Sequence, residues 1–193
     1  MSDPVTRVAE LLDRAARAGV VEPNAMALAT VDSEGRPSVR MVLLKGLDDS
    51  GFVFFTNLES RKGEELRANP HAALCFHWRE FETQVRVEGA VELVTDAEAD
   101  AYFASRPRGS RIGAWASEQS RPLPVFEDLE RRVVEVEARY EDQEVPRPPF
   151  WSGFRLTPAT IEIWSGKPSR LHLREVYQRS EPDAPWEMQL LYP

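Results

Sequence analysis

The sequence of 193 residues contains only one cysteine, Cys75, which lies in an apolar run. A single cysteine cannot form a disulfide within the chain, so the fold must be stable without that cross-link. A chain of this length can bury about 70% of the surface that its unfolded state exposes, which is enough for a core without a disulfide or structural metal. Because disulfide-free chains are typical of reducing compartments, we predict a cytoplasmic protein.

Long apolar runs and an excess of positive charge are also missing. No run approaches the roughly 20 apolar residues of a membrane-spanning helix, and the first residues lack the basic and apolar regions of a secretory signal. The chain has 24 Lys and Arg against 32 Asp and Glu, for a net charge of −8. Nucleic-acid binding depends on positive surface charge, so we expect neither a nucleic acid nor a membrane as partner.

Several common ligand motifs are absent as well. The sequence has no glycine-rich phosphate loop, no dinucleotide-binding glycine pattern and no metal-type group of Cys and His residues. Its three histidines, His71, His77 and His172, are far apart. Isolated histidines are more often structural residues than ligands, so we predict no metal site and assign His71 and His77 to the structural class.

What the chain does contain is a series of β-rich runs with helices between them. Asp3, Pro4 and Gly19 suit the cap, first turn and end of a helix over residues 4–19. Further helices are expected in "LESRKGEELRANP", "DAEADAYFAS" and "VFEDLERRVVEVEARYE", and strands include "HAALCFHW", "TQVRVEGAVELV", "GFRLTPATIEIW" and "EMQLLYP". This order predicts an α+β fold, an antiparallel β-barrel with flanking and inserted helices. We expect one domain over residues 1–193, with a C-terminal strand region at about 150–193.

Arginine, lysine and hydroxyl side chains gather in four stretches of this acidic chain. The stretches are "VRMVLLK", "FFTNLESRKG", "AYFASRPRGSRIGAWASEQSRP" and "SRLHLREVY". Arginine forks, and hydroxyls at a turn or helix start, are good phosphate ligands. Several such clusters would serve ligands that carry more than one phosphate, whereas scattered surface arginines are the alternative for each cluster alone.

Spacing suggests how the fourth stretch is arranged. Read as a strand, residues 169–177 place Arg170, His172 and Arg174 on one face and Leu171 and Leu173 on the other. A row of cations repels itself unless an anion lies across it, so the stretch could be a binding face. Spacing alone favours a solvated strand face with the leucines in the core.

Two other spacings bear on the cationic stretches. Tyr102 and Arg106 are four residues apart, so a helix would place them on one face. Ser110 continues this spacing, but Pro107 disfavours helical geometry at Arg106, so the face is expected to continue across a bend. Arg40 and Lys45 have opposite parity on a regular strand, which requires either a bulge or two different ligands.

Together these motifs resemble the pyridoxamine 5'-phosphate oxidase family. The resemblance runs from about residue 22 to residue 193 and depends on the order and spacing of "EPNAMALATVD", "RMVLLK", "FFTNLESRKG", "YFASRPRGSRIGAWASEQS", "FWSGFRL", "IEIW" and the "RLH-R" element. It implies a split β-barrel that forms a homodimer, with FMN at the subunit interface.

The resemblance also implies ligand contacts at individual positions. FMN would contact Arg40, Met41, Val42, Leu43, Leu44, Lys45, Phe55, Thr56, Arg61, Lys62, Gln84, Gln119, Ser120, Trp164 and Arg174. The substrate phosphate would be held by Lys45, Tyr102, Arg106 and Ser110, and the catalytic residues Arg170 and His172 would face the substrate ring. Arg40 would then serve the flavin phosphate and Lys45 the substrate phosphate, which accounts for their opposite parity.

The activity implied is that of an FMN-dependent oxidase. Pyridoxamine 5'-phosphate or pyridoxine 5'-phosphate would be oxidised by O2 to pyridoxal 5'-phosphate, with release of hydrogen peroxide. The flavin supplies the chemistry, whereas the protein supplies position and charge, and His172 could assist proton removal. Two alternatives are a phenazine-pathway oxidase of the same fold, for which the phosphate residues would be dispensable, and a non-catalytic carrier of FMN or pyridoxal phosphate.

The chain departs from the family pattern at two places. Where the family usually has an acidic residue between the histidine and the following arginine, this chain has Leu173. On a strand Leu173 would face away from the ligands, so we expect an altered pH response rather than loss of activity. The chain also begins close to its first helix, so the N-terminal segment that can cover the substrate in longer relatives is expected to be absent or very short.

Overall fold

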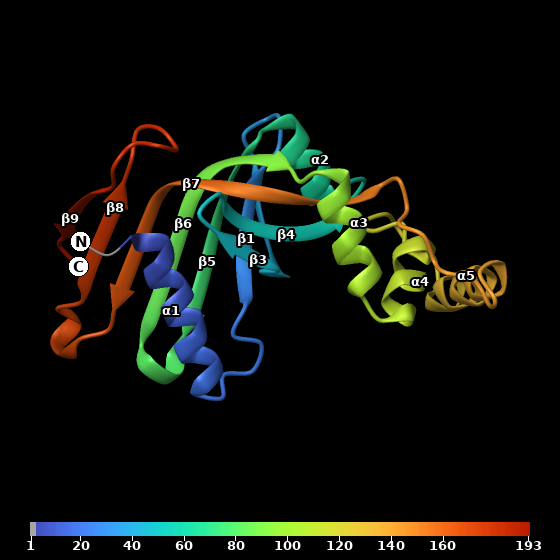
Figure 1. Cartoon of the computed structure of the whole chain (residues 1–193), viewed down its shortest axis with the longest axis horizontal. Helices are drawn as coiled ribbons and strands as arrows, with labels where there is room; N and C mark the ends of the chain where they lie inside the picture. Colours follow the sequence, from blue (N-terminus) through green and yellow to red (C-terminus); the bar gives the residue numbers. More distant parts are fainter. Residues whose placement is uncertain (1–2) are drawn as a thin grey trace.

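Across residues 3–193, the part of the chain that the computed structural model describes, one antiparallel sheet of nine strands curls into a half-barrel (Figure 1). The strands lie in the order β2-β1-β5-β6-β7-β4-β3, while β8 pairs with β7 and β9 pairs with β8. The predicted α+β split barrel with inserted helices is therefore confirmed. Strands from both ends of the chain share this sheet, which favours the single domain predicted for residues 1–193.

Strand bounds follow the β-rich runs of the sequence and the turns between them. They are β1 Ala25–Val31, β2 Pro37–Leu43, β3 Gly46–Asp48, β4 Gly51–Asn57, β5 His71–Trp78, β6 Thr83–Leu93, β7 Trp151–Ser165, β8 Leu173–Gln178 and β9 Glu187–Leu191. The turn into β4 needs glycine at position 51, since its φ is +132° and a Cβ there would lie 2.1 Å from the carbonyl oxygen of Leu156.

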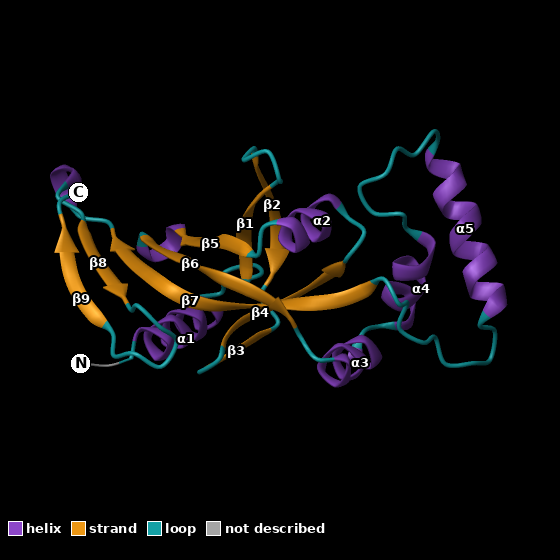
Figure 2. Ribbon diagram, turned by 90° about the horizontal axis from the view of Figure 1, so that it is seen from above, coloured by secondary structure: helices purple, strands orange, loops and turns teal. Residues whose placement is uncertain are grey.

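Five α-helices flank this sheet within residues 3–193 (Figure 2): α1 Pro4–Arg17, α2 Arg61–Ala68, α3 Asp96–Ser105, α4 Arg108–Ala116 and α5 Phe126–Arg139. The expected N-terminal helix is confirmed, and the Asp3 carboxylate caps it by accepting hydrogen bonds from the amides of Val5 and Thr6. Helix α4 was not predicted as a separate element. Its start is set by Pro107, because Arg106 is held in an extended conformation and α3 cannot continue.

The core fills the concave side of the sheet, where α1 packs over it (Figure 1). Its largest fully buried side chains include Phe52, Phe54, Phe76 and Trp78. Burying one such side chain contributes about 1.5–3 kcal/mol. A smaller cluster around Ile112 and Val136 joins α4 to α5. No helix within residues 3–193 combines the length and apolar character needed to cross a membrane.

The convex face of β2, β1 and β5 carries small or apolar side chains. Register places Ala27 opposite both Met41 and Cys75, and Ala29 opposite both Val39 and Ala73. Met41 is 65% exposed and Val39 is 68% exposed in the single chain. An uncovered apolar face of this kind is typical of an interface between proteins.

Candidate active site

A cavity of about 790 Å3 opens where β2, β4, α2, α3 and α4 meet. This volume is within the usual range for small-molecule sites. Of the residues predicted to bind ligands, those that line it are Arg40, Met41, Val42, Leu43, Lys45, Phe55, Thr56, Lys62, Tyr102, Arg106, Ser110 and Gln119. Its lining also includes Asn57, Ser105, Pro107, Gly113, Ala114, Ser117 and Trp151, which the sequence had not indicated as ligand contacts. The structure thus brings three of the four cationic stretches to one cavity.

The first cationic group, which we call the α2 cradle, consists of Arg40, Thr56, Ser60, Arg61 and Lys62. Strand β4 ends directly before α2, and the Ser60 hydroxyl caps the helix by accepting a hydrogen bond from the Gly63 amide at 3.3 Å. The Lys62 ammonium donates to Thr56 Oγ1 at 3.2 Å and to Gln119 Oε1 at 2.8 Å. A helix N-terminus with adjacent cations and hydroxyls is suited to a phosphate group.

Lys62 has an altered protonation equilibrium because of this setting. Burial, followed by the neighbouring charge of Arg40, lowers its pKa to about 8, although the charge of Glu65 acts in the opposite direction. A bound phosphate dianion would favour the charged ammonium and raise this pKa again. Lys62 therefore stays mainly charged at neutral pH but loses its proton above about pH 8 when no anion is bound.

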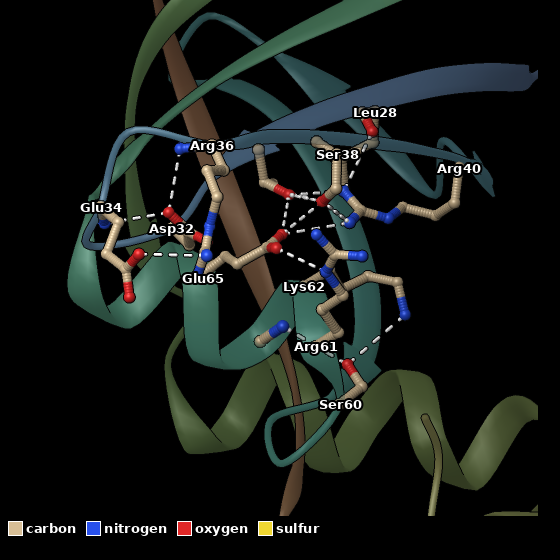
Figure 3. A network of polar contacts seen from close by, with 12 residues as sticks. Leu28, Asp32, Glu34, Arg36, Ser38, Arg40, Ser60, Arg61, Lys62 and Glu65 are labelled. Carbon is tan, nitrogen blue, oxygen red and sulfur yellow. Dashed lines mark hydrogen bonds and ion pairs between the residues drawn. The ribbon is translucent and has the colours of Figure 1, made fainter. Parts of the chain in front are cut away.

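Behind the cradle lies Glu65, a residue that the sequence analysis missed (Figure 3). Its carboxylate accepts a hydrogen bond from Arg61 Nε at 2.8 Å and another from Arg40 Nη2 at 3.1 Å. Figure 3 shows the Ser38 hydroxyl reaching the same carboxylate, at 2.6 Å. The four-residue spacing of Arg61 and Glu65 on a helix was the signal that could have revealed this pair.

The second cationic group, which we call the α3–α4 anchor, consists of Lys45, Tyr102, Arg106 and Ser110. Arg106 ends α3 and Ser110 lies in the first turn of α4. Both line the cavity despite the break at Pro107, so the expected continuation across a bend is confirmed. The Lys45 ammonium lies 5.9 Å from the centre of the Tyr102 ring.

Aromatic residues hold the anchor in place. Tyr102 stacks on Phe55 at 4.1 Å between ring centres, and Phe55 stacks on Trp151 at 5.4 Å. The Arg106 guanidinium lies 4.9 Å from the Trp151 ring centre. Trp151 is thus a positioning residue that the sequence analysis missed, although it lies in the quoted "FWSGFRL" motif.

One polar atom of the anchor is buried without a hydrogen-bond acceptor among residues 3–193. Arg106 Nη1 is buried, and no residue within the described part of the chain accepts a hydrogen bond from it. Burial also lowers the pKa of this guanidinium, because the charged form loses solvation. A buried N–H without an acceptor costs free energy, so the Arg106 guanidinium lacks one hydrogen-bond acceptor within the described residues of the single chain.

Five of the eight predicted residues that remain form a third set, the β7–β8 group: Gln84, Trp164, Arg170, His172 and Arg174. Gln84 pairs with Trp164 across β6 and β7, and Trp164 pairs with Arg174 across β7 and β8. The His172 ring packs against Trp164 in a tilted arrangement, with 4.5 Å between ring centres. None of these residues lines the cavity.

Strand β8 lies at the opposite end of the sheet from α3 and α4 (Figure 1), the helices that contribute residues to the cavity lining. Strand β7 joins them, with Trp151 at its first position beside the cavity and Trp164 near its last. Thirteen residues of strand correspond to about 40 Å along the chain at about 3.3 Å per residue. Within one chain the two sets are therefore separated by nearly the whole length of β7.

The predicted strand over residues 169–177 is wrong in its first half. Residues Pro168–Arg170 form a 3-10 turn in which Ser169 and Arg170 have φ of 60° and 61°, and β8 begins only at Leu173. Ser165 pairs with Leu173, so the residues between them must reverse the chain. Arg170 and His172 therefore do not share a strand face with Arg174.

Leu171 does not pack in the core as predicted, and Leu173 lies at the solvent edge of the sheet. Leu171 is 71% exposed because it lies in the reversing loop, and Leu173 is 36% exposed at the first position of β8. Three other predicted contacts lie outside the cavity lining. Leu44 is buried in the main core, Arg61 reaches Glu65, and Ser120 follows Gln119 with φ of 72°.

Comparison with known proteins now places the chain. Residues 12–140 match the family model described as pyridoxamine 5'-phosphate oxidase. Residues 151–193 match the pyridoxine 5'-phosphate oxidase C-terminal dimerisation region. The chain belongs to the pyridoxamine 5'-phosphate oxidase family. The resemblance seen in the sequence motifs is thereby confirmed, and the β7–β8 group lies largely within the segment that matches the dimerisation region.

Relatives within this family are similar over their whole length. A pyridoxine/pyridoxamine 5'-phosphate oxidase of Myxococcus xanthus (strain DK1622) is 62% identical over 191 residues, which cover 99% of this chain and 92% of that protein. A protein of the same name from Brucella canis is 55% identical over 192 residues, covering 100% of this chain and 95% of that protein.

Two solved structures share the fold. PhzG from Burkholderia lata 383, solved in complex with tetrahydrophenazine-1-carboxylic acid, is 35% identical with a TM-score of 0.93, covering 100% of this chain and 94% of that one. A pyridoxamine 5'-phosphate oxidase-related, FMN-binding protein from Nostoc punctiforme has a TM-score of 0.77 at 18% identity, covering 100% of this chain and 99% of that one. The second likeness concerns the fold alone.

Proposed function

We propose that this protein is an FMN-dependent oxidase that converts pyridoxamine 5'-phosphate and pyridoxine 5'-phosphate to pyridoxal 5'-phosphate, with O2 as acceptor and hydrogen peroxide as product. The observation that carries this proposal is the presence of two separate groups of cationic and hydroxyl side chains at one cavity, the α2 cradle and the α3–α4 anchor. One cavity with two such groups suits two phosphorylated molecules that must meet. Curated relatives that are 62% and 55% identical have this activity in their names.

FMN fits the α2 cradle. The N-terminus of α2 and the side chains of Lys62 and Thr56 offer N–H and O–H donors to a phosphate, while the side chains of β2 form an adjacent wall of the cavity. When bound, FMN supplies the hydride acceptor and the site that reacts with O2. The contribution of the chain is to hold the phosphate and to fix where the flavin ring lies.

The phosphorylated substrate fits the α3–α4 anchor. Arg106 Nη1 is an unpaired buried donor, and Lys45, Tyr102 and Ser110 line the same cavity. Holding the phosphate here fixes the distance from the reacting carbon to the flavin, which removes most of the search that a free substrate would need.

We propose that the active site is completed by a second copy of the chain in a homodimer. Three observations support this: the β7–β8 group is remote from the cavity of its own chain, residues 151–193 match a dimerisation region, and the apolar convex face around Val39 and Met41 is uncovered. The β7–β8 group of one subunit would then face the cavity of the other, with FMN between them.

His172 would orient the substrate in this arrangement. Its Nδ1 accepts a hydrogen bond from the Lys167 amide at 3.2 Å, so the neutral ring carries its proton on Nε2. That N–H can donate to the substrate amine or hydroxyl but cannot accept a proton from it. His172 and Arg170 therefore act by positioning the reacting group, which is sufficient when the amine enters already neutral.

The alternative that a specific observation favours is a phenazine-pathway oxidase, because PhzG superimposes with a TM-score of 0.93. The α3–α4 anchor argues for a phosphorylated substrate instead, since Arg106 has a buried donor without an acceptor.

We further propose a cytoplasmic location, which the single cysteine supports.

A spectrum of the purified protein, followed by assays of aldehyde and hydrogen peroxide, tests the function. We expect a flavin spectrum and formation of pyridoxal 5'-phosphate from both phosphorylated substrates, but not from their unphosphorylated forms. A protein that binds FMN and substrate without consuming O2 would be a carrier. Turnover of a reduced phenazine carboxylic acid but not of pyridoxamine 5'-phosphate would establish the alternative oxidase.

The affinity for FMN should fall as the pH rises above about 8. Lys62 has a pKa of about 8 in the free protein and a higher pKa beside a phosphate, so FMN binding requires proton uptake above that pH. The dissociation constant of FMN, measured at pH 7, 8 and 9 with the apoprotein, should be flat at first and then rise. Lys62→Met should bind more weakly and lack this rise. An equal rise in Lys62→Met would remove Lys62 as its cause.

A further inference from the structure

The carboxylate of Glu65 lies directly behind the α2 cradle, where it would repel an anionic ligand bound in the cradle. Its side chain is 5% exposed, while that of Arg40 is 20% exposed. It accepts hydrogen bonds from Thr30, Ser38, Arg40 and Arg61, which lie on β1, β2 and α2. A buried carboxylate is tolerated only when it is paired and hydrogen-bonded in this way.

The network settles the ionisation state of Glu65. Burial alone raises the pKa of its carboxyl, but hydrogen bonds from Ser38, Thr30, Arg61 and Arg40 outweigh burial and lower the pKa to about 2. Glu65 is therefore charged at every physiological pH. The three cations Arg40, Arg61 and Lys62 together with the Glu65 carboxylate give a net charge of +2. This equals in magnitude, and is opposite in sign to, the charge of a phosphate dianion.

Glu65 also fixes the guanidinium of Arg40, which lines the cavity. Arg40 Nη1 donates to Thr30 Oγ1 at 2.6 Å and to the carbonyl oxygen of Leu28 at 3.1 Å, while Nη2 donates to Ser38 and Glu65 (Figure 3). A guanidinium held on both nitrogens has lost its rotamer freedom before any ligand binds. Preorganisation of this kind increases affinity because less entropy is lost on binding.

We infer that Glu65 is a positioning residue for the flavin phosphate, acting through Arg40 and Arg61. This inference depends on the proposed function, since it assigns the α2 cradle to FMN. For the effect of removing the Glu65 carboxylate on FMN affinity, this inference predicts the opposite direction from an argument based on net charge alone. If only net charge mattered, removing the Glu65 carboxylate would tighten FMN binding; if position matters, its removal weakens binding.

The test is titration of the apoprotein of Glu65→Gln with FMN and, separately, with riboflavin, which lacks the phosphate. We expect the dissociation constant of FMN to rise about tenfold, equivalent to about 1.4 kcal/mol, while that of riboflavin changes less than about twofold. A purely structural role would weaken both flavins together.

Glu59→Gln is the matched control, because Glu59 is an exposed glutamate directly before the cap of the same helix. It removes the same charge near the cradle without touching the network, so FMN affinity should be unchanged or slightly higher. In an Arg61→Ala background, Glu65→Gln should cost less than in the parent, since one of the groups that it positions is gone.

Ser38→Ala provides a milder test should Glu65→Gln fail to fold. It removes one hydrogen bond to Glu65 and one to Arg40, so it should weaken FMN binding but not riboflavin binding. Tighter FMN binding, or equal loss of both flavins, in either variant would overturn the inference. Failure of the parent protein to bind FMN at all would instead overturn the proposed function.

Discussion

Arg106→Ala is expected to raise the KM for pyridoxamine 5'-phosphate by about ten- to a hundredfold, as the loss of one charged hydrogen bond worth about 1.5–3 kcal/mol predicts. Arg106 has a buried Nη1 without an acceptor, and the Trp151 ring holds its guanidinium against the cavity. The substrate phosphate would supply the missing acceptor. Flavin affinity should not change, because the α2 cradle is a separate group, and kcat should fall less than kcat/KM.

Arg108→Ala is the natural control for that experiment. Arg108 is only two residues away, but its guanidinium donates to the carbonyl oxygens of Gln143 at 2.7 Å and Tyr140 at 2.6 Å. It therefore holds the end of α5 and should affect melting temperature without affecting KM. Steady-state kinetics at saturating FMN separate the two variants. If the KM values of both rise equally, the α3–α4 anchor does not bind the substrate phosphate.

The second large effect is recovery of activity in mixed dimers. An Arg106→Ala chain has a defective anchor in its own cavity. An Arg170→Ala/His172→Ala chain has an intact cavity but a defective β7–β8 group, which would face the cavity of its partner. Each homodimer should be nearly inactive at low substrate concentration. After unfolding and refolding together in equal amounts, half the dimers are hybrids with one intact site of two, so about a quarter of parent activity should return.

The control is a mixture of two variants that both alter the α3–α4 anchor. Arg106→Ala refolded with Lys45→Ala should recover nothing, because each cavity in a hybrid then contains one defect. Tags of different size on the two chains allow the hybrid to be purified and counted. Absence of recovery in a purified hybrid of the first pair would show that the β7–β8 group does not act across the interface.

Local patterns in the sequence were sufficient for most of the elements and for half of the site. Apolar residues and turn sequences predicted the strands, and Asp3 and Pro4 predicted the start of α1. The spacing from Tyr102 to Ser110 across Pro107 predicted which side chains of the anchor share a face. These features depend on residues close together in the chain, where steric and hydrogen-bonding preferences act directly. The family resemblance added the ligands, which no spacing could supply.

The tertiary structure alone decided three features. The loop before Leu173 exists because β8 must return antiparallel to β7, a long-range pairing that overrode the alternation of Arg170, Leu171 and His172. Glu65 and Trp151 became part of the site only when distant elements packed around them.

The division of the site was the third of these features. The cavity residues and the β7–β8 group both lie in motifs of the family. However, the first residue of β7 lies beside the cavity, whereas its last residues, with the β7–β8 group, lie far from it. Sequence motifs specify which side chains are available, but which of them meet depends on the length and pairing of the strands that carry them.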